Sequence, residues 1–357
     1  MRKFLFAALL FASAASLTSC EKDSPSTEPI KFNLPYDMII TNEGSWGSKT
    51  ASVSLYFEKK DSVGNDIFAK VNGRTMGDIL QSMKIVDSLG YFIMNVPGTI
   101  EIASLKTFKS KATIEDLGSP RYMEVYNGKG YVSEWNNDAI VVIDLASNKV
   151  IKSIKVGVDP EGLLLIGDKL FVANSSGMGG NNNTVSIVDL KTETVVKTVT
   201  VGDIPRMFAK DINGDVWVIC SGFQDWNDAS KNTNSSLCKI DKNTYAVTKV
   251  DLGNFRPTQL FANPAKNKLY YGAGYGVKGI YQIDITATKA PSTPFIDEYF
   301  YGFTVNQSTG EIFGFTNAGI KEKANKAFKY NTAGVLLNEK SKYNTAGVTP
   351  NGGYFVK

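Results

Sequence analysis

The most informative absence in this chain of 357 residues is histidine, of which it has none. Ser-His-Asp and Cys-His nucleophilic sites are therefore excluded, as are zinc, iron and copper sites that depend on imidazole ligands. Carboxylates can still act as acids or bases, but the commonest general base is missing. The absence favours a binding protein over an enzyme, and we predict neither a catalytic residue, nor a cofactor, nor a metal site.

Clustered charge and long apolar runs are also scarce. The net charge is only +4, and no block of five basic residues occurs, so nucleic acid is not an expected partner. Beyond the first 20 residues, no apolar stretch is long enough to span a bilayer. Only three Cys are present, and two of them, Cys220 and Cys238, lie outside that N-terminal region.

The N-terminus has the features of an export signal. Arg2 and Lys3 precede an apolar run at residues 4–15, which is too short for a membrane span. The next residues, Leu17-Thr18-Ser19-Cys20, resemble the bacterial lipobox, in which the Cys is lipidated and becomes the first residue of the mature protein. An ordinary secretory signal with an incidental Cys is the alternative.

We therefore predict three segments. Residues 1–19 are a lipoprotein signal peptide, residues 20–35 are the lipid anchor Cys20 and a flexible tether, and residues 36–357 are the folded domain. Glu21 and Asp23 resemble the acidic signal that directs Bacteroidota lipoproteins to the cell surface. The expected location is the outer membrane, held by the lipid anchor and facing the exterior.

A strand-like motif recurs through the rest of the chain. Residues 185–190 read Val-Ser-Ile-Val-Asp-Leu, and residues 140–145 read Ile-Val-Val-Ile-Asp-Leu. The equivalent positions in all copies are Tyr56, Ser104, Asp144, Asp189, Asp241, Asp284 and Asn331, spaced 40 to 52 residues apart. Self-similarity at this period indicates a propeller or another repeat array.

A Gly- and Pro-containing marker separates successive copies, as in Gly118-Ser-Pro120 and Gly202-Asp-Ile-Pro205. Between two markers lie four short β-branched runs, which in the clearest unit are residues 163–166, 169–173, 185–190 and 195–201. Four strands in about 45 residues are typical of a propeller blade.

The two ends of the chain complement each other. Residues 37–41 read as the second strand of a blade that lacks its first, and residues 349–356 read as a marker and a first strand without a blade. Joining them removes the open edges of the array. We therefore predict an all-β, seven-bladed β-propeller of four-stranded blades, with an open β-solenoid as the alternative.

The units resemble those of the YncE-like, or YVTN, propeller family, which read G-x-x-P, then YVAN, then a variable loop, then V-x-V-I-D. Leu170-Phe-Val-Ala-Asn174 and Gly130-Tyr-Val-Ser133 match the second part, and the Ile-Asp-Leu strands match the last. The resemblance covers residues 36–357 and implies a fold, not an activity.

The loops between the second and third strands are rich in Trp, Asn, Gln and Gly, and they hold three of the four Trp. Aromatic surface mixed with amides suits a large ligand with flat faces and many polar groups; packing against neighbouring blades is the alternative. The predicted ligand-binding residues are Trp46, Tyr122, Trp135, Asn136, Asn137, Met178, Asn181, Asn182, Arg206, Phe223, Gln224, Trp226, Asn227, Arg256 and Tyr275.

For several side chains the sequence allows two interpretations. Arg121, Arg206 and Arg256 in the marker turns either converge as an anion site or form ordinary salt bridges. Asp225 and Asp228 have the oxygen ligands of a calcium site but match no defined calcium loop. Cys220 and Cys238, on adjacent strands, form either a disulfide or two buried thiols.

A lipobox, a single propeller of this repeat and an aromatic, amide-rich face resemble the BtuG-type corrinoid-binding surface lipoproteins of Bacteroidota. The resemblance implies capture of cobalamin or a related corrinoid and its delivery to an outer-membrane TonB-dependent transporter, the corrinoid being transported cargo. Binding of a glycan or of a protein, as a scaffold or adhesion module, are the alternatives. An enzyme using Glu134 or Asp225 is the least favoured.

Overall fold

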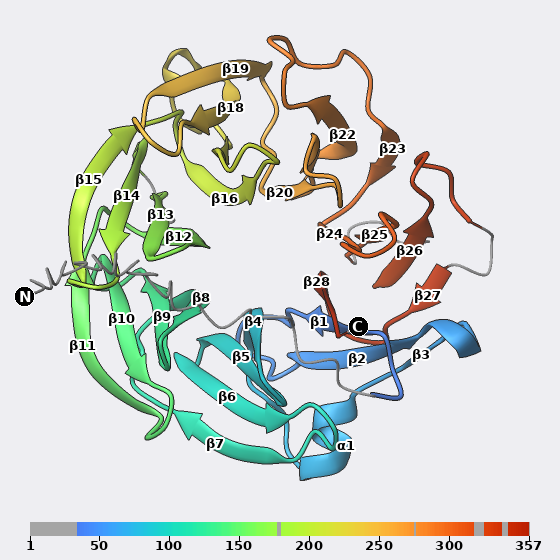
Figure 1. Cartoon of the computed structure of the whole chain (residues 1–357). Coiled ribbons are helices and arrows are strands. Elements are labelled where there is room, and N and C mark those ends of the chain that lie inside the picture. The colour runs from blue at the N-terminus through green and yellow to red at the C-terminus, as the bar shows by residue number, and fades with distance from the viewer. Residues whose placement is uncertain (1–33, 177–179, 275, 318–324, 338–341, 357) are drawn as a thin grey trace, which may run out of the picture. The chain divides into compact units, whose positions relative to one another are not determined.

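The computed structural model describes residues 34–176, 180–274, 276–317, 325–337 and 342–356. Those residues form seven four-stranded antiparallel sheets arranged as blades around one axis (Figure 1). The predicted signal peptide, the anchor Cys20 and most of the tether lie outside the described residues. Within the described part of the chain, no helix is both long and apolar enough to cross a membrane.

Six blades are made of consecutive strands. Blade 1 comprises β4 (Ile79–Val86), β5 (Leu89–Val96), β6 (Thr99–Ser104) and β7 (Ser110–Ile114), and blade 2 comprises β8 (Pro120–Tyr126), β9 (Lys129–Glu134), β10 (Ala139–Asp144) and β11 (Lys149–Lys155). Blade 3 comprises β12 (Pro160–Ile166), β13 (Lys169–Asn174), β14 (Thr184–Asp189) and β15 (Thr194–Thr200), and blade 4 comprises β16 (Pro205–Lys210), β17 (Val216–Cys220), β18 (Ser235–Ile240) and β19 (Val247–Gly253). Blade 5 comprises β20 (Gln259–Ala262), β21 (Lys268–Gly272), β22 (Lys278–Asp284) and β23 (Ile296–Tyr299), and blade 6 comprises β24 (Gly302–Val305), β25 (Ile312–Phe315), β26 (Lys326–Tyr330) and β27 (Lys342–Asn344).

The seventh blade joins the two ends of the folded domain. Its strand order is β28 (Pro350–Phe355), β1 (Met38–Asn42), β2 (Ser52–Phe57) and β3 (Ser62–Gly64). The antiparallel register pairs Met38 with Phe355 and Ile39 with Tyr354. The predicted closure and the predicted seven-bladed fold are both confirmed, and the solenoid alternative is wrong, because β28 supplies the missing inner strand.

The four runs predicted for the clearest unit match β12 to β15. The main difference is that β12 begins at Pro160, three residues earlier than predicted. In the part of the chain that the structure describes, three short helices were not predicted: η1 (Glu58–Lys60), α1 (Ile67–Asn72) and η2 (Ala229–Lys231). Each is at most six residues long, too short to show a helical period in the sequence.

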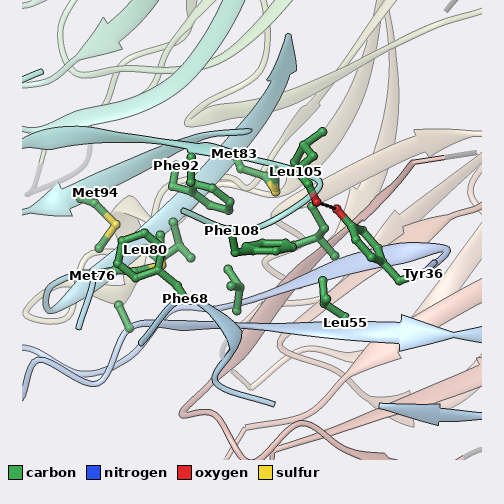
Figure 2. Close-up of a cluster of buried hydrophobic side chains, with 14 of the residues drawn as sticks. Tyr36, Leu55, Phe68, Met76, Leu80, Met83, Phe92, Met94, Leu105 and Phe108 are labelled. Atoms are coloured by element: carbon green, nitrogen blue, oxygen red, sulfur yellow. Dashed lines mark hydrogen bonds between the residues drawn. The ribbon is translucent and has the colours of Figure 1, made fainter. Parts of the chain in front are cut away.

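Apolar side chains fill the spaces between neighbouring sheets. Figure 2 shows the cluster where blade 7 meets blade 1, in which Phe68 of α1 packs with Phe92 and Phe108. Beside them the Tyr36 hydroxyl donates a 2.7 Å hydrogen bond to the carbonyl of Leu105, 69 residues later in the chain. Because each sheet is covered on both faces, middle strands such as β10 and β14 are apolar in nearly continuous runs, whereas the outer strands β11 and β15 are largely exposed.

Blade 4 contains the two cysteines of the propeller. Cys220 ends β17, Cys238 lies in β18, and both are buried free thiols. Of the two alternatives left open by the sequence, the structure therefore has the buried thiols. The one tryptophan outside the loops, Trp217 in β17, is also buried, and its indole N–H donates a 2.9 Å hydrogen bond to Asp211.

Candidate functional site

The seven inner strands line one cavity along the axis of the propeller. Its volume is about 870 Å³, and β4, β8, β12, β16, β20, β24 and β28 all contribute to its wall. The lining mixes aromatic and aliphatic side chains with charged and amide groups. Cavities of this size and mixed lining are where small organic ligands bind in proteins.

A repeated irregularity places polar side chains in this cavity. The register of β8, β12 and β16 against the neighbouring strand shifts directly after the marker prolines Pro120, Pro160 and Pro205. Such a bulge re-aims the side chains of the extra residues. The residue after each proline, Arg121, Glu161 or Arg206, lines the cavity. We call this end of the cavity, where the inner strands begin, the marker end.

Arg121 and Glu161 form a closed pair at the marker end. The guanidinium donates hydrogen bonds of 3.0 Å from Nε and 2.9 Å from Nη2 to the two oxygens of Glu161. The other side of the guanidinium lies over the ring of Trp135, 3.9 Å from its centre. Burial alone would lower the pKa of Arg121, but the charge and hydrogen bonds of Glu161 raise it, so Arg121 stays charged.

A second carboxylate of the cavity, Glu43, comes from the loop after β1. Its Oε2 accepts a 2.7 Å hydrogen bond from the Tyr301 hydroxyl. Burial raises the pKa of Glu43, while the hydrogen bond from Tyr301 and the charge of Arg121 oppose the rise. Burial also raises the pKa of Tyr301, and the neighbouring charge of Glu43 adds to that effect. Tyr301 is therefore a neutral hydrogen-bond donor at physiological pH.

Amide groups brace the wall formed by β4, β8 and β28. The Asn351 amide donates to the carbonyls of Leu80 and Gln81, at 3.0 and 3.2 Å, and Gln81 in turn donates to the Tyr122 hydroxyl. Burial raises the pKa of Tyr122, so this hydroxyl is neutral as well. The network holds β4, β8 and β28 at fixed distances and gives the cavity a preformed polar side.

Three of the predicted ligand-binding residues line the cavity: Trp46, Tyr122 and Arg206. Trp46 is 78% exposed, which is unusual for a side chain with so much apolar surface. It lies in the loop between β1 and β2, so it stands at the marker end. Arg206 is half-buried, and its Nε has no hydrogen-bond partner among the described residues.

The predicted residues of the β9–β10 loop stabilise that loop instead of facing the cavity. The backbone N–H groups of Asn136 and Asn137 and the side-chain amide of Asn137 all donate to the buried carboxylate of Glu134. Trp135 is half-buried beneath Arg121. For Trp135, the alternative of packing within the propeller is the one that the structure has.

The long β13–β14 loop, residues 175–183, is described only in part. Met178 lies outside the described residues, as does Tyr275 of the β21–β22 loop. Asn181 is exposed, whereas the side-chain oxygen of Asn182 accepts hydrogen bonds from Asn183 N–H and the Thr184 hydroxyl. None of the described residues of this loop lines the cavity.

The β17–β18 loop carries the other predicted aromatic residues. Phe223 is half-buried, Gln224 and Asn227 are exposed, and Trp226 is 86% exposed without lining the cavity. Arg256 is tied to this loop, since its guanidinium donates to the carbonyls of Ser221, Phe223 and Phe255. Arg256 therefore does not converge with Arg121 and Arg206 on one anion site.

The carboxylates of Asp225 and Asp228 already have a positively charged side chain, Lys231, beside them. Lys231 Nζ lies 3.7 Å and 3.6 Å from one oxygen of each. Backbone N–H groups of Asn227 and Asp228 donate to Asp225 and lower its pKa. Among the described residues, no group of three or more acidic or cysteine side chains could hold a metal ion.

The cavity residues that were not predicted include Glu43, Gln81 and Glu161. Glu161 follows the marker Pro160 as Arg121 follows Pro120, so the repeat itself held the signal that both face the axis. Gln81 belongs to a blade in which no Gly-Pro marker precedes the inner strand, and Glu43 lies in a loop after the second strand, so the sequence gives no comparable sign for either residue.

Comparison with known protein families identifies the family of this chain. A family model described as "Domain of unknown function (DUF5074)" matches residues 36–348. The chain belongs to that family. No curated protein matches the sequence. The family match spans most of the propeller and specifies no ligand or activity.

Solved structures with the same fold are distant in sequence. A candidate 6-phosphogluconolactonase from Bacteroides fragilis NCTC 9343 has a TM-score of 0.68 and 9% identity, over 94% of this chain and 100% of that one. A second, from Bacteroides uniformis ATCC 8492, has a TM-score of 0.65 and 10% identity, over 90% and 99%. Kuenenia stuttgartiensis hydrazine synthase has a TM-score of 0.54 and 15% identity, over 69% and 74%. At these identities the likeness concerns the fold alone.

Proposed function

We propose that this DUF5074 propeller is a surface lipoprotein that binds a corrinoid at the marker end of its central cavity and passes it to an outer-membrane TonB-dependent transporter. The observation that carries the binding site is Trp46, which is 78% exposed on the wall of the 870 Å³ cavity. An exposed indole beside a mixed polar and apolar cavity suits a ligand with broad flat surfaces. The corrinoid class comes from the resemblance of the lipobox and the repeat.

The chemistry of the wall agrees with this ligand class. A corrinoid has a flat macrocycle surrounded by amide groups, and the cavity offers the neutral Tyr122 hydroxyl, which accepts from Gln81 and keeps its own O–H to donate. Since the chain contains no histidine, it has no imidazole to replace the lower base on cobalt. The bound corrinoid is therefore expected to keep the absorption spectrum of its own coordination.

The test uses the chain without residues 1–20, mixed with cyanocobalamin and separated by gel filtration with detection at a corrinoid absorption band. Co-elution at near-stoichiometric ratio is expected. Clean separation at micromolar protein would overturn corrinoid capture. A spectrum with a protein-derived nitrogen ligand would contradict the expected coordination.

Two exposed tryptophans provide a matched pair of variants. Trp46→Ala is expected to weaken binding by about fivefold or more, because it removes an aromatic contact of roughly 1 kcal/mol beyond area burial. Trp226→Ala removes an equally exposed indole that does not line the cavity, and binding is expected to stay within about twofold. The reverse result would move the site to the β17–β18 loop.

A protein-binding face is the second candidate, favoured by the same Trp226. Its 86% exposure lies outside the cavity, and a large exposed aromatic side chain is typical of interaction surfaces. Pull-down from the outer-membrane fraction with wild type and Trp226→Ala tests this role. Loss of one partner band with Trp226→Ala, together with unchanged corrinoid binding, would show that Trp226 binds a protein partner and Trp46 the corrinoid.

We further propose that the chain is not an enzyme. The two carboxylates considered for catalysis are engaged, Glu134 by backbone N–H groups of its loop and Asp225 by backbone N–H groups and Lys231. The distant likeness to candidate 6-phosphogluconolactonases supplies the substrate to try. Hydrolysis of 6-phosphogluconolactone above the spontaneous rate, abolished by Glu43→Gln or Glu161→Gln, would overturn this proposal.

A further inference from the structure

One cation in the central cavity lacks a counter-ion. Arg206 lines the wall beside the bulge of β16, and within the described residues its side chain has no carboxylate partner. Its Nε is buried without a hydrogen-bond acceptor. A buried N–H without an acceptor is uncommon in folded proteins and calls for an explanation.

Among the described residues, the acidic side chains that line the cavity are Glu43, Glu124 and Glu161, and each already has a partner in the protein. Both oxygens of Glu161 accept from Arg121, although Glu161 lies on β12, between the strands of Arg121 and Arg206. Glu124 pairs with Lys84 at 2.6 Å, and Glu43 accepts from Tyr301. Arg206 occupies the position in blade 4 that Arg121 occupies in blade 2. Because Glu161 is paired with Arg121, Arg206 is left free to meet a ligand.

The position of Arg206 is tightly constrained. Gly162 of β12 packs against its backbone, so that a Cβ at Gly162 would lie 2.2 Å from the Arg206 carbonyl oxygen. On the other side, Thr258 lines the wall, and its hydroxyl donates to the Ala273 carbonyl. The close-packed backbone fixes the point from which the Arg206 side chain enters the cavity.

We propose that Arg206 is the anchor of an anion subsite that holds a phosphate group of the ligand inside the cavity. The planar guanidinium presents paired N–H donors to two oxygens of one phosphate. That this phosphate is the phosphodiester of a cobalamin rests on the proposed function. The subsite itself rests only on the unpaired guanidinium in the cavity.

The decisive test compares cyanocobalamin with cobinamide, a corrinoid without the phosphate and lower base. Isothermal titration is expected to show that Arg206→Gln weakens cyanocobalamin about 10- to 100-fold, the loss typical of a charge-assisted pair. Binding of cobinamide is expected to be unchanged. Arg206→Lys, which keeps the charge but not the paired donors, is expected to lie in between. Arg74→Gln is the control, since Arg74 pairs with Glu101 and does not line the cavity.

A second measurement separates failure of the subsite from failure of corrinoid binding. Inorganic phosphate, at ionic strength held constant with chloride, is expected to raise the Tm of the wild type more than that of Arg206→Gln. If neither corrinoid binds but this difference is present, the proposed function fails and the subsite stands. If the Arg206→Gln variant binds cyanocobalamin like the wild type, the subsite is overturned while corrinoid binding stands. An equal effect of phosphate on both proteins, a general salt effect, also overturns it.

Discussion

Glu161 receives both hydrogen bonds of the Arg121 guanidinium across two neighbouring blades, and the two side chains are only 5% and 12% exposed. The pair closes between the bulges that follow Pro120 and Pro160. The pair therefore connects β8 to β12 at the wall of the cavity. Because Glu161 is used in this pair, the guanidinium of Arg206 is the charge of that wall left for a ligand.

The first prediction concerns the stability of this pair. Glu161→Ala leaves a buried guanidinium without its partner, and we expect the free energy of unfolding to fall by about 3 kcal/mol. The double variant Arg121→Met with Glu161→Leu removes both charges and is expected to recover most of that loss. Urea denaturation monitored by circular dichroism measures both changes.

An exposed ion pair is the control for this measurement. Lys278 and Asp297 lie 2.8 Å apart, but their side chains are 48% and 63% exposed. Asp297→Asn is expected to change the free energy of unfolding by less than about 1 kcal/mol. Equal losses for Glu161→Ala and Asp297→Asn would contradict the importance of the buried pair.

The second prediction concerns closure of the propeller. Gly353 of β28 packs so closely that a Cβ would lie 2.7 Å from Met38 Sδ and 2.7 Å from Thr304 Cγ2. Gly353→Val is expected to destabilise the protein by roughly 2 kcal/mol or more, through overpacking. It is also expected to speed limited proteolysis at both ends of the domain.

Gly64 provides the matched control, because it lies in β3, the outer strand of the same blade. There a Cβ would meet the ring of Phe57 at 3.3 Å and Ile67 Cδ1 at 3.6 Å. Gly64→Val is expected to destabilise the protein clearly less than Gly353→Val. The same melting temperature for both variants would show that β28 adjusts freely and is not the constraint on closure.

The third prediction concerns the thiols of blade 4. Since Cys220 and Cys238 are buried and free, we expect neither to react with a thiol reagent such as Ellman's reagent in the native protein. Two thiols per chain are expected in denaturant, for protein that lacks Cys20. Zero reactive thiols in denaturant, restored to two by a reductant, would show that a disulfide forms across the β17–β18 loop.

The fourth prediction is a pH dependence at Glu43. Burial raises the pKa of Glu43, so the folded protein binds this proton more readily than the unfolded chain. The stabilising contribution is therefore fully present below the ordinary pKa of a glutamate and is lost as pH rises through the raised value. As pH rises above the ordinary pKa of a glutamate, the wild type should lose stability relative to Glu43→Gln.

Urea denaturation of both proteins across this range measures that difference, and it cancels the other titrating carboxylates because both proteins share them. Glutamine retains an oxygen that can accept the hydrogen bond from Tyr301. Parallel stability profiles for the two proteins would exclude a burial-raised pKa at Glu43.

The fold could be predicted from the sequence because its repeat is a local property. Most blades repeat a Gly-Pro marker and an apolar strand that ends at a polar residue, and both signals depend only on neighbours in the chain. Closure was also predictable, since residues 37–41 and 349–356 are complementary incomplete units. Helix α1 was missed because six residues carry no period.

The candidate site was predictable only where the repeat reaches it. Arg206 and Tyr122 sit one and two residues after marker prolines, and both face the axis. Composition drew attention to the tryptophans of the loops, but composition cannot distinguish Trp46 on the cavity wall from Trp135 under a guanidinium or Trp226 outside the cavity.

The sequence alone thus determined the number of blades, their strand order and the way the ring closes, because hydrophobic pattern and turn residues act over short distances. Only the tertiary structure decided the charges of the cavity. Glu161 pairs with Arg121 across 40 residues and Glu43 meets Tyr301 across 258 residues. Which side chains pair in this way depends on how the blades pack around the axis. The same packing leaves Arg206 without a carboxylate partner among the described residues.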